Sequence, residues 1–447
     1  MASAPTVAVM APTRRSLIER GTALFLIVAL LMVNLAIINL RVANFPVRAA
    51  GAVLLLGAAA VIYPGVLWAS IRQHALLLWL SFGLAVLGGF VSMVYGTPFG
   101  RIWQGIMETS IQVAVTLIVV TVLAKIAGFR ASAFAVVAVI AASVAVAALQ
   151  FVGFEPAWTF REWLGSLQNE PAFTPLINRR PMGFSYSPIQ LSTQICVAFA
   201  VYAAAREYGR RQAMERVSAD PMILAALGFL VVGSIVTLTR SPILGAAIFF
   251  LVYAVRRPGS WLLFLGLLGI LVLYLIGPLL LDAVQENAPR VVRTNDDSAA
   301  ARISMNTFGI LLFADNPLGY GYAFKPSDHF TKFWQFLYNT PHPSAVQDKE
   351  LHNYVLSMLN TYGVGLLLLV PLVVALLRRG SHMIIFFVPF IVHIIFHNSG
   401  PFWNDIPFWF GIAALSATPA ADAVRVNPTR RRRWHSPPPA VSTGSTG

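Results

Sequence analysis

Cysteine and charge are the scarcest features of this sequence. Cys196 is the one cysteine among 447 residues, which excludes a disulfide framework and a cysteine metal site within a single chain. Only 11% of the residues are charged and 57% are hydrophobic, a composition that ordinary soluble domains do not have. Acidic residues number 18 against 32 basic ones. The sequence therefore favours a membrane protein, with Cys196 as a packing residue in one of its apolar segments.

Long apolar runs stand where charge is missing. They are roughly 17 to 25 residues long, enough to cross a hydrocarbon core of about 30 Å as helices, and the short alternating segments of a membrane barrel are absent. The sequence predicts an all-α polytopic membrane protein with about twelve transmembrane helices. We expect these helices at 21–40, 49–70, 75–95, 103–124, 131–152, 188–205, 221–238, 242–255, 260–281, 352–377, 383–398 and 405–418.

Basic residues are unevenly distributed between alternate loops. With the N-terminus in the cytoplasm, the short inner loops carry most of the arginines, led by 206–216 and by Arg430 to Arg433 near the C-terminus. We therefore expect a cytoplasmic N-terminus at 1–20, a transmembrane helical domain at 21–418 and a disordered basic cytoplasmic tail at 419–447. Topology and membrane lipids account for the net charge of +14, so no nucleic-acid partner is needed.

This orientation can be tested with reporter fusions. A reporter joined after Pro326 is expected to report the outer side, and one joined after Arg216 the cytoplasm, because the arginine clusters hold their loops inside. Alkaline phosphatase and green fluorescent protein activities measure the two locations. The reverse pattern would move every candidate site residue named below to the cytoplasmic side.

Two outer loops are too long to be simple connections. The first covers 153–187 and is rich in aromatic residues, proline and arginine, and the second covers 282–351. Long loops on a rigid helical scaffold commonly carry binding and catalytic residues. We therefore expect the binding and catalytic residues in these loops and at the adjoining helix ends.

Three outer arginines are candidate anion-binding residues. Arg180 precedes Pro-Met-Gly-Phe, Arg240 lies in a tight hairpin between two apolar helices, and Arg302 lies in the second loop. A cation at the membrane boundary is costly without an anionic partner, and guanidinium groups suit phosphate oxygens. The alternative is that these side chains reach lipid headgroups or pair with acidic residues in the second loop.

His352 is the candidate general base. It is predicted at the outer mouth of a helix, where a neutral imidazole could accept a proton from a hydroxyl, and Asn353 beside it could orient the ring or contact substrate. A histidine at a helix start is more often a capping or interfacial residue. His397 has a similar predicted depth and remains a physical alternative, whereas His393 is expected to pack inside the bundle.

These residues occur in short motifs that resemble those of the O-antigen ligase and O-antigen polymerase family. The segment from His352 to Gly363 is similar to the family signature H-[NSQ]-x-x-L-x(6)-G at all fixed positions. Pro317 to Gly321 resembles the family's Pro-x-Gly-x-Gly segment, which contributes Gly319 and Gly321. Arg302, Arg240-Ser241 and Arg180-x-x-Gly-x-Phe resemble three further elements, although Thr239 stands where the family has serine.

The resemblance implies a membrane glycosyltransferase with a GT-C-like fold and a large periplasmic loop, in the bacterial inner membrane with both termini cytoplasmic. Such an enzyme transfers a glycan from an undecaprenyl-diphosphate-linked donor to another glycan or to a lipid A-core acceptor, with inversion and without a metal or other cofactor. His352 would be the catalytic base, and Arg240, Arg180 and Arg302 would bind the donor diphosphate. Asn353, Gly319 and Gly321 would support the site.

Two alternatives remain open at this stage. About twelve spans also suit a transporter or a flippase of lipid-linked glycans, although almost no acidic residue lies at a predicted helix centre. Within the enzyme interpretation, ligase and polymerase share donor and chemistry and differ in the acceptor.

Overall fold

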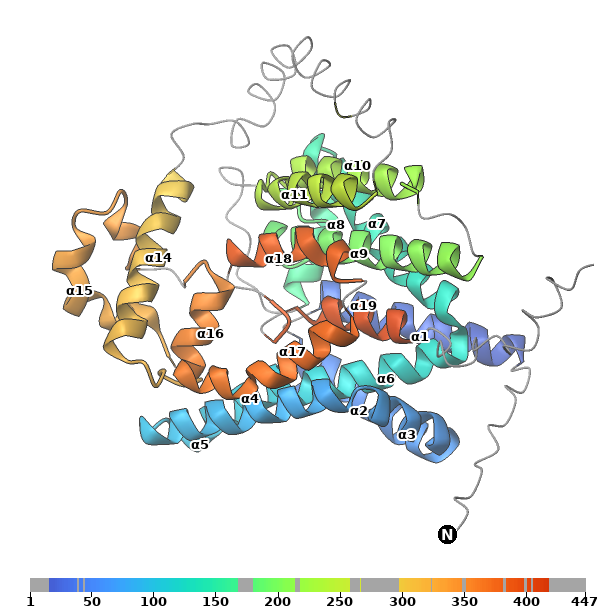
Figure 1. The fold of residues 1–447 in the computed structure, drawn as a ribbon, viewed down its shortest axis with the longest axis horizontal. Helices are drawn as coiled ribbons and strands as arrows, with labels where there is room; N and C mark the ends of the chain where they lie inside the picture. The colour runs from blue at the N-terminus through green and yellow to red at the C-terminus, as the bar shows by residue number, and fades with distance from the viewer. Residues whose placement is uncertain are drawn as a thin grey trace, which may run out of the picture.

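The computed structural model describes most of the chain as helices. The described residues are 16–37, 40–42, 45–167, 180–213, 218–257, 266, 297–322, 324–347, 351–380, 383–397, 400–402 and 405–417. Within them, the helices Gln112–Ala127 and Pro188–Gln212 each pack against several other helices of one bundle. Figure 1 shows this bundle, with the yellow and orange helices of the C-terminal half at one side of it.

The N-terminal half contains a helical bundle and one short β-ladder, in which β1 (Arg41–Val42) pairs antiparallel with β2 (Phe45–Pro46). Its helices are α1 (Leu17–Ala36), α2 (Val47–Ile62), α3 (Pro64–Gln73), α4 (Ala75–Val94), α5 (Phe99–Ile106), the π-helical turn η1 (Met107–Ile111), α6 (Gln112–Ala127), α7 (Phe129–Phe151), α8 (Glu155–Ser166) and α9 (Pro188–Gln212).

The C-terminal half contains shorter helices. They are α10 (Pro221–Val236), α11 (Ser241–Arg256), α14 (Asp297–Asp315), η2 (Pro326–His329), α15 (Phe330–Leu337), η3 (Pro343–Val346), α16 (Tyr354–Tyr362), η4 (Gly363–Leu369), α17 (Val370–Arg379), η5 (Ile384–Phe387), α18 (Val388–Ile395) and α19 (Ile406–Ser416). Several of these start with proline in the first turn, where its missing N–H is not needed for a helical hydrogen bond.

The fold confirms a polytopic helical membrane protein. Among the described residues, six helices are long and apolar enough to cross a membrane, or up to seven if the bent pair α2–α3 is one span, and four further apolar helices are shorter. Apart from 49–70, the predicted spans outside 260–281 overlap these helices, and 260–281 falls outside the described part of the chain apart from residue 266. Cys196 is fully buried in α9, as expected for a packing residue.

One predicted span differs clearly from the structure. Residues 49–70 were expected to form one helix, but α2 and α3 meet at Tyr63 with a bend of 118°. Pro64 starts α3 and disfavours a helical conformation at the residue before it, so the helix ends there. This segment is a broken span or a re-entrant element.

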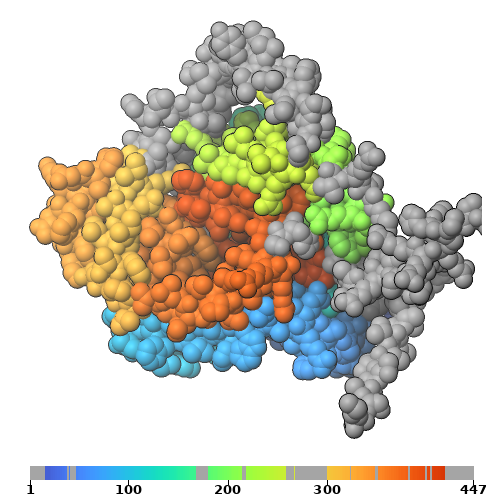
Figure 2. Space-filling view, in the orientation of Figure 1, coloured from blue at the N-terminus to red at the C-terminus, as the bar shows by residue number. Residues whose placement is uncertain are grey.

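The second long loop has a hydrophobic core of its own. α14 contributes Met305, Phe308 and Leu312 to a buried cluster, and α15 contributes Phe333 and Leu337. The sequence suggested no role for 325–349, and the structure gives its described part a packing role against α14. Figures 1 and 2 show α14 and α15, in yellow to orange, together at one side of the molecule beside α16. α14 also packs directly against α16, the helix that follows His352.

Candidate functional site

Arg240 lies in a strained hairpin between α10 and α11. The turn is short, and Leu238 adopts a φ of 55°, a left-handed conformation that is rare for a residue with a side chain. Thr237 and Thr239 are buried there and share hydrogen bonds with the Ser192 hydroxyl of α9, at 2.8 and 2.7 Å. This hydroxyl cluster fixes the backbone immediately before Arg240. Arg240 itself is half-buried and is the N-cap of α11.

Arg180 reaches the same hairpin from the segment before α9. Its Nη2 donates to the carbonyl oxygens of Thr237 at 3.1 Å and Leu238 at 2.9 Å, at the end of α10. A cation at a helix C-terminus is favourable, because the last carbonyl groups lack helical partners. Arg180 therefore has a structural role in holding the hairpin, next to the Arg240 backbone.

The segment that follows Arg180 is fixed on α7. The Gln150 side chain accepts from the backbone N–H groups of Met182 and Gly183, each at 2.9 Å, and the Ser143 hydroxyl accepts from Phe184 N at 3.0 Å. Gly183 has a φ of +58°, and a side chain there would collide with the Ser143 carbonyl. The glycine of the Arg180-x-x-Gly-x-Phe element is thus required by close backbone contact with α7.

A buried pair of histidines lies directly behind Arg240. The hydroxyl of Ser241, the first residue of α11, is 2.9 Å from His393 Nδ1 and 3.0 Å from His397 Nε2. The other nitrogen of His393, Nε2, is 3.0 Å from the Thr193 hydroxyl of α9. Ser241, His393 and His397 are all buried. These bonds tie the start of α11 to α18 and to α9.

The predicted charged residues converge on His397. Arg180, Arg302 and His352 all interact electrostatically with its ring, although they come from the segment before α9, from α14 and from the bend before α16. Arg302 and His352 are half-buried. Arg240 joins this group through its neighbour Ser241. The hairpin therefore holds Arg180 next to the Arg240 backbone and beside Ser241 and His397, and Arg302 and His352 act electrostatically on the same ring.

The signature from His352 to Gly363 has a structural explanation at each of its other fixed positions. Asn353 is the N-cap of α16, where its side-chain oxygen accepts from Leu356 N at 3.1 Å. Leu356 packs on α14 at Gly309. Gly363 ends α16 with a φ of +65°, a conformation that favours glycine. His352, the fourth fixed position, is half-buried in the bend before α16.

Gly319 and Gly321 support the far end of α16. Tyr320 N and Gly321 N donate to the carbonyls of Asn360 and Thr361 at 2.7 and 3.0 Å, and Val364 N donates to Pro317 O at 2.7 Å. α16 separates this contact from His352 by about 14 Å, at 1.5 Å per residue. Burial and the adjacent Asp315 raise the pKa of Tyr320, so its phenol stays protonated and donates to Leu312 O at 3.2 Å. These glycines therefore position the signature helix and do not contact the charged group.

Substitution of Gly319 tests this supporting role. Gly319 has a φ of +86°, and a Cβ there would lie 2.5 Å from Gly363 N, so Gly319→Ala should destabilise the protein by about 1–3 kcal/mol and lower its melting temperature. Gly228→Ala in α10 is the control, because its added methyl group meets no atom within 4 Å. Thermal unfolding of the purified proteins in detergent measures the effect. Equal melting temperatures for Gly319→Ala and the control would contradict this account.

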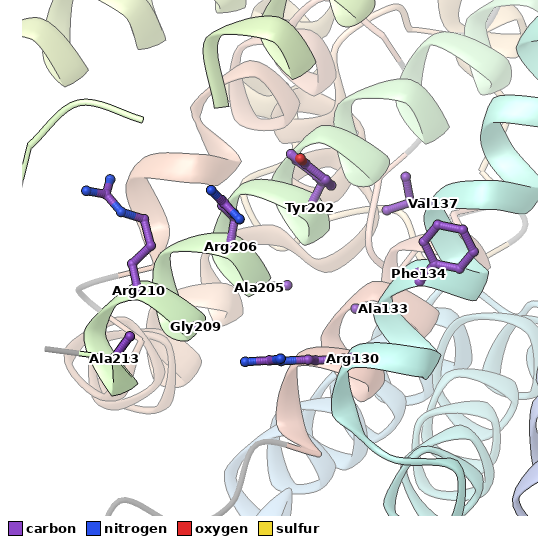
Figure 3. A pocket seen from close by; sticks show the side chains of 10 residues that line it. All are labelled: Arg130, Ala133, Phe134, Val137, Tyr202, Ala205, Arg206, Gly209, Arg210 and Ala213. Carbon is purple, nitrogen blue, oxygen red and sulfur yellow. The ribbon is translucent and has the colours of Figure 1, made fainter. Parts of the chain in front are cut away.

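A groove of about 410 Å³ lies elsewhere, between the start of α7 and the end of α9. Figure 3 shows Arg130 extending from α7 toward Gly209 and Ala213 of α9, with Phe134 and Val137 along the same wall. Arg206 and Arg210 also line it, and their guanidinium groups bond Asp220 and Ser218 respectively. The groove lies at the opposite ends of α7 and α9 from Gln150 and Thr193, and no predicted site residue lines it.

Sequence reasoning missed the connection between Ser241, His393 and His397. His393 and His397 are four residues apart on an apolar segment, which places them on one helix face, and this spacing was the available signal. Nothing in the sequence indicated that their face meets Ser241, which is 152 and 156 residues away. Arg161 of α8 was also missed. It is buried, and its Nε donates to Ser185 O at 3.1 Å.

Comparison with known proteins finds a family match over part of the chain. Residues 225–370 match the family model described as O-antigen ligase. The match includes the Arg240 hairpin, α14 with Arg302, the Gly319 segment and the signature from His352 to Gly363, and it leaves Arg180 outside. It confirms the family resemblance seen in the motifs. No curated protein matches the chain.

Proposed function

Because residues 225–370 carry the domain of the O-antigen ligase family, we propose that the chain transfers a glycan from undecaprenyl diphosphate to an acceptor sugar hydroxyl at the periplasmic face of the inner membrane. The observation that carries this proposal is that Arg180, Arg302 and His352, from three separate segments, act electrostatically on His397, whose ring is also 3.0 Å from the hydroxyl of Ser241, the residue after Arg240. Arginines suit the diphosphate of such a donor, and an imidazole suits proton removal from a hydroxyl.

In this proposal His352 is the general base. It accepts the proton of the acceptor hydroxyl, whose oxygen attacks the anomeric carbon from the face opposite the diphosphate. The bond between that carbon and the diphosphate oxygen breaks, and its electron pair leaves with undecaprenyl diphosphate. A single displacement of this kind inverts the anomeric configuration.

Arg240, Arg180 and Arg302 neutralise the charge that develops on the leaving diphosphate. Arg240 stands at the start of α11 in a hairpin held by the Ser192 cluster and by Arg180, so its backbone is fixed before the donor arrives. In many sugar transferases a metal ion supplies this neutralisation. We propose that guanidinium groups supply it here, in a GT-C-like fold of about twelve spans.

A transfer assay tests the proposal. Purified protein in lipid bilayers is mixed with an undecaprenyl-diphosphate-linked glycan that carries a labelled sugar, together with lipid A-core or a second lipid-linked glycan as acceptor. We expect a labelled product with one of these acceptors and release of undecaprenyl diphosphate. Movement of labelled donor across the bilayer with no product would instead favour the flippase alternative.

The acceptor class is read from cells. A deletion strain that loses capped lipopolysaccharide but still makes long lipid-linked glycan indicates a ligase. A strain limited to single-repeat products indicates a polymerase.

A further inference from the structure

A chain of hydrogen bonds leads through the protein interior to His397. It runs from Thr193 in α9 to His393 in α18, then to Ser241 at the start of α11 and to His397, with heavy-atom distances of 3.0, 2.9 and 3.0 Å. These side chains are buried, so their hydrogens have to be shared among them and not with bulk water. The donor and acceptor capacity of each group then decides which atom of each hydrogen-bonded pair carries the hydrogen.

The Thr193 hydroxyl decides where the first hydrogen lies. Its hydroxyl donates to the Ile189 carbonyl at 3.0 Å, so toward His393 Nε2 it acts as the acceptor. The Ile189 carbonyl also acts as a hydrogen-bond partner of His393, and a carbonyl can only accept. His393 therefore carries its hydrogen on Nε2. Burial favours the neutral imidazole, in which the other nitrogen, Nδ1, is an acceptor.

The Ser241 hydroxyl then decides where the His397 hydrogen lies. Its one hydroxyl hydrogen is donated to His393 Nδ1, so toward His397 Nε2 the Ser241 oxygen accepts. His397 is thereby fixed as the tautomer with hydrogen on Nε2 and a lone pair on Nδ1. His397 Nδ1 is buried and has no hydrogen-bond partner among the residues that the structure describes. A buried acceptor without a partner is costly, which points to a donor that arrives during function.

The groups around His397 include four candidates for that donor. Arg180, Arg302, His352 and His393 are the charged or titratable groups that act on its ring. His393 is already turned toward Ser241 and Thr193. Arg180 bonds the end of α10 through Nη2. Arg302 comes from α14 and is assigned to the donor diphosphate in the function proposed above. His352 lies just before α16 and His397 just after α18, and α16 packs against α18. A neutral imidazole that uses one nitrogen as the base carries its hydrogen on the other nitrogen, which can donate.

We propose that His397 is a positioning residue for the base: its Nδ1 accepts the N–H of the His352 imidazole, directly or through one water, and turns the other His352 nitrogen toward the acceptor hydroxyl. This inference rests on the function proposed above. When His352 takes the hydroxyl proton it becomes an imidazolium with two N–H donors, one of which is held by His397. The arrangement follows the logic of a base oriented by a third group, with a neutral imidazole in place of a carboxylate.

The test compares Ser241 and His397 variants with His352→Ala in the transfer assay. Ser241→Ala removes the group that fixes the His397 tautomer, and His397→Leu removes the acceptor, so each should lower turnover roughly ten- to a hundredfold at unchanged donor affinity. Ser241→Thr keeps the hydroxyl and should retain activity near that of the unmodified protein. His74→Gln is the matched control, because His74 forms a buried imidazole–hydroxyl pair with Thr121 at 3.0 Å that shares no residue with the Thr193–His393–Ser241–His397 chain.

The pH–rate profile gives a readout that a purely structural role would not move. Without His397 as acceptor, the His352 imidazolium is less stabilised. The pH at which turnover falls on the acidic side of the profile should therefore be lower in Ser241→Ala and close to that of the unmodified protein in Ser241→Thr. Arg180, Arg302 and His393 are present in both variants and cannot cause a difference between them. Nitrogen-15 NMR of histidine-labelled protein provides a measurement independent of activity, and it should show His397 with hydrogen on Nε2.

The possible outcomes distinguish a failure of the positioning role of His397 from a failure of His352 as the general base. If His352→Ala abolishes transfer while Ser241→Ala and His397→Leu keep normal turnover and a normal pH profile, His397 does not position the base. The assignment of His352 as the general base is then kept. A hydrogen on His397 Nδ1, or a loss in His397→Leu equal to that in His352→Ala, also overturns it. If His352→Ala retains full turnover, the proposed base itself fails.

Discussion

Replacing His352 by alanine is expected to lower turnover by about 10²- to 10⁴-fold, the usual contribution of a general base. The structural reason is that capping and packing account for Asn353, Leu356 and Gly363, while His352, like Arg180 and Arg302, acts electrostatically on His397. Donor binding should change little, because the base contacts the acceptor hydroxyl. Turnover and donor affinity are measured separately on purified protein.

His342→Ala is the control for this experiment. His342 lies in the same long loop, and its link to α14 is a backbone bond from His342 N to the Ser304 hydroxyl, which alanine keeps. Its turnover should therefore stay close to normal. A His352→Ala protein that keeps more than half of its turnover, at normal abundance, would remove the residue from the mechanism.

Replacing Arg240 should mainly weaken donor binding. Arg240→Ala removes a cation with several N–H donors from the fixed hairpin, and loss of hydrogen bonds to a charged group corresponds to roughly ten- to a hundredfold in affinity. Arg240→Lys keeps the charge and loses the planar fork, so we expect a strong defect there as well. Binding of a labelled undecaprenyl-diphosphate glycan to protein in bilayers measures the change.

Arg256→Ala is the matched control, since Arg256 is exposed in the last turn of the same helix, α11. Equal donor affinity in Arg240→Ala and Arg256→Ala would show that the hairpin arginine does not hold the diphosphate. A defect in Arg240→Ala that Arg240→Lys fully restores would mean that charge alone matters, and would argue against bidentate contact.

The sequence predicted the helical architecture well because apolar runs are local features that need no knowledge of contacts. It also selected Arg180, Arg240, Arg302 and His352 through motifs. The bond from Arg180 to the α10 end links residues 57 and 58 positions apart, and no local pattern encodes such a pairing. The bend at Tyr63 was missed because hydropathy is continuous across Pro64, although the proline itself was a visible signal.

Gly319 and Gly321 illustrate a different limit. A motif contains residues that line a site and residues that support the helix on which the site residues stand. The sequence alone does not distinguish these two kinds. Backbone geometry makes the distinction. Their positive φ angles and their contacts with Thr361 to Gly363 place them at the far end of α16. The Ser241–His393–His397 connection depends on tertiary packing of α11 against α18 and was equally invisible.

The contact between Pro317–Gly321 and the end of α16 also restricts how the long outer loop can move. Three main-chain hydrogen bonds join the two segments, Asn360 Nδ2 bonds Gly309 O of α14 at 2.9 Å, and Tyr322 N bonds the Ser92 hydroxyl of α4 at 2.9 Å. A swing of α14 away from the bundle would break all of these bonds at once. α14 and α16 are therefore joined near their C-terminal ends, so a movement of α14 that keeps these bonds has to move α16 as well.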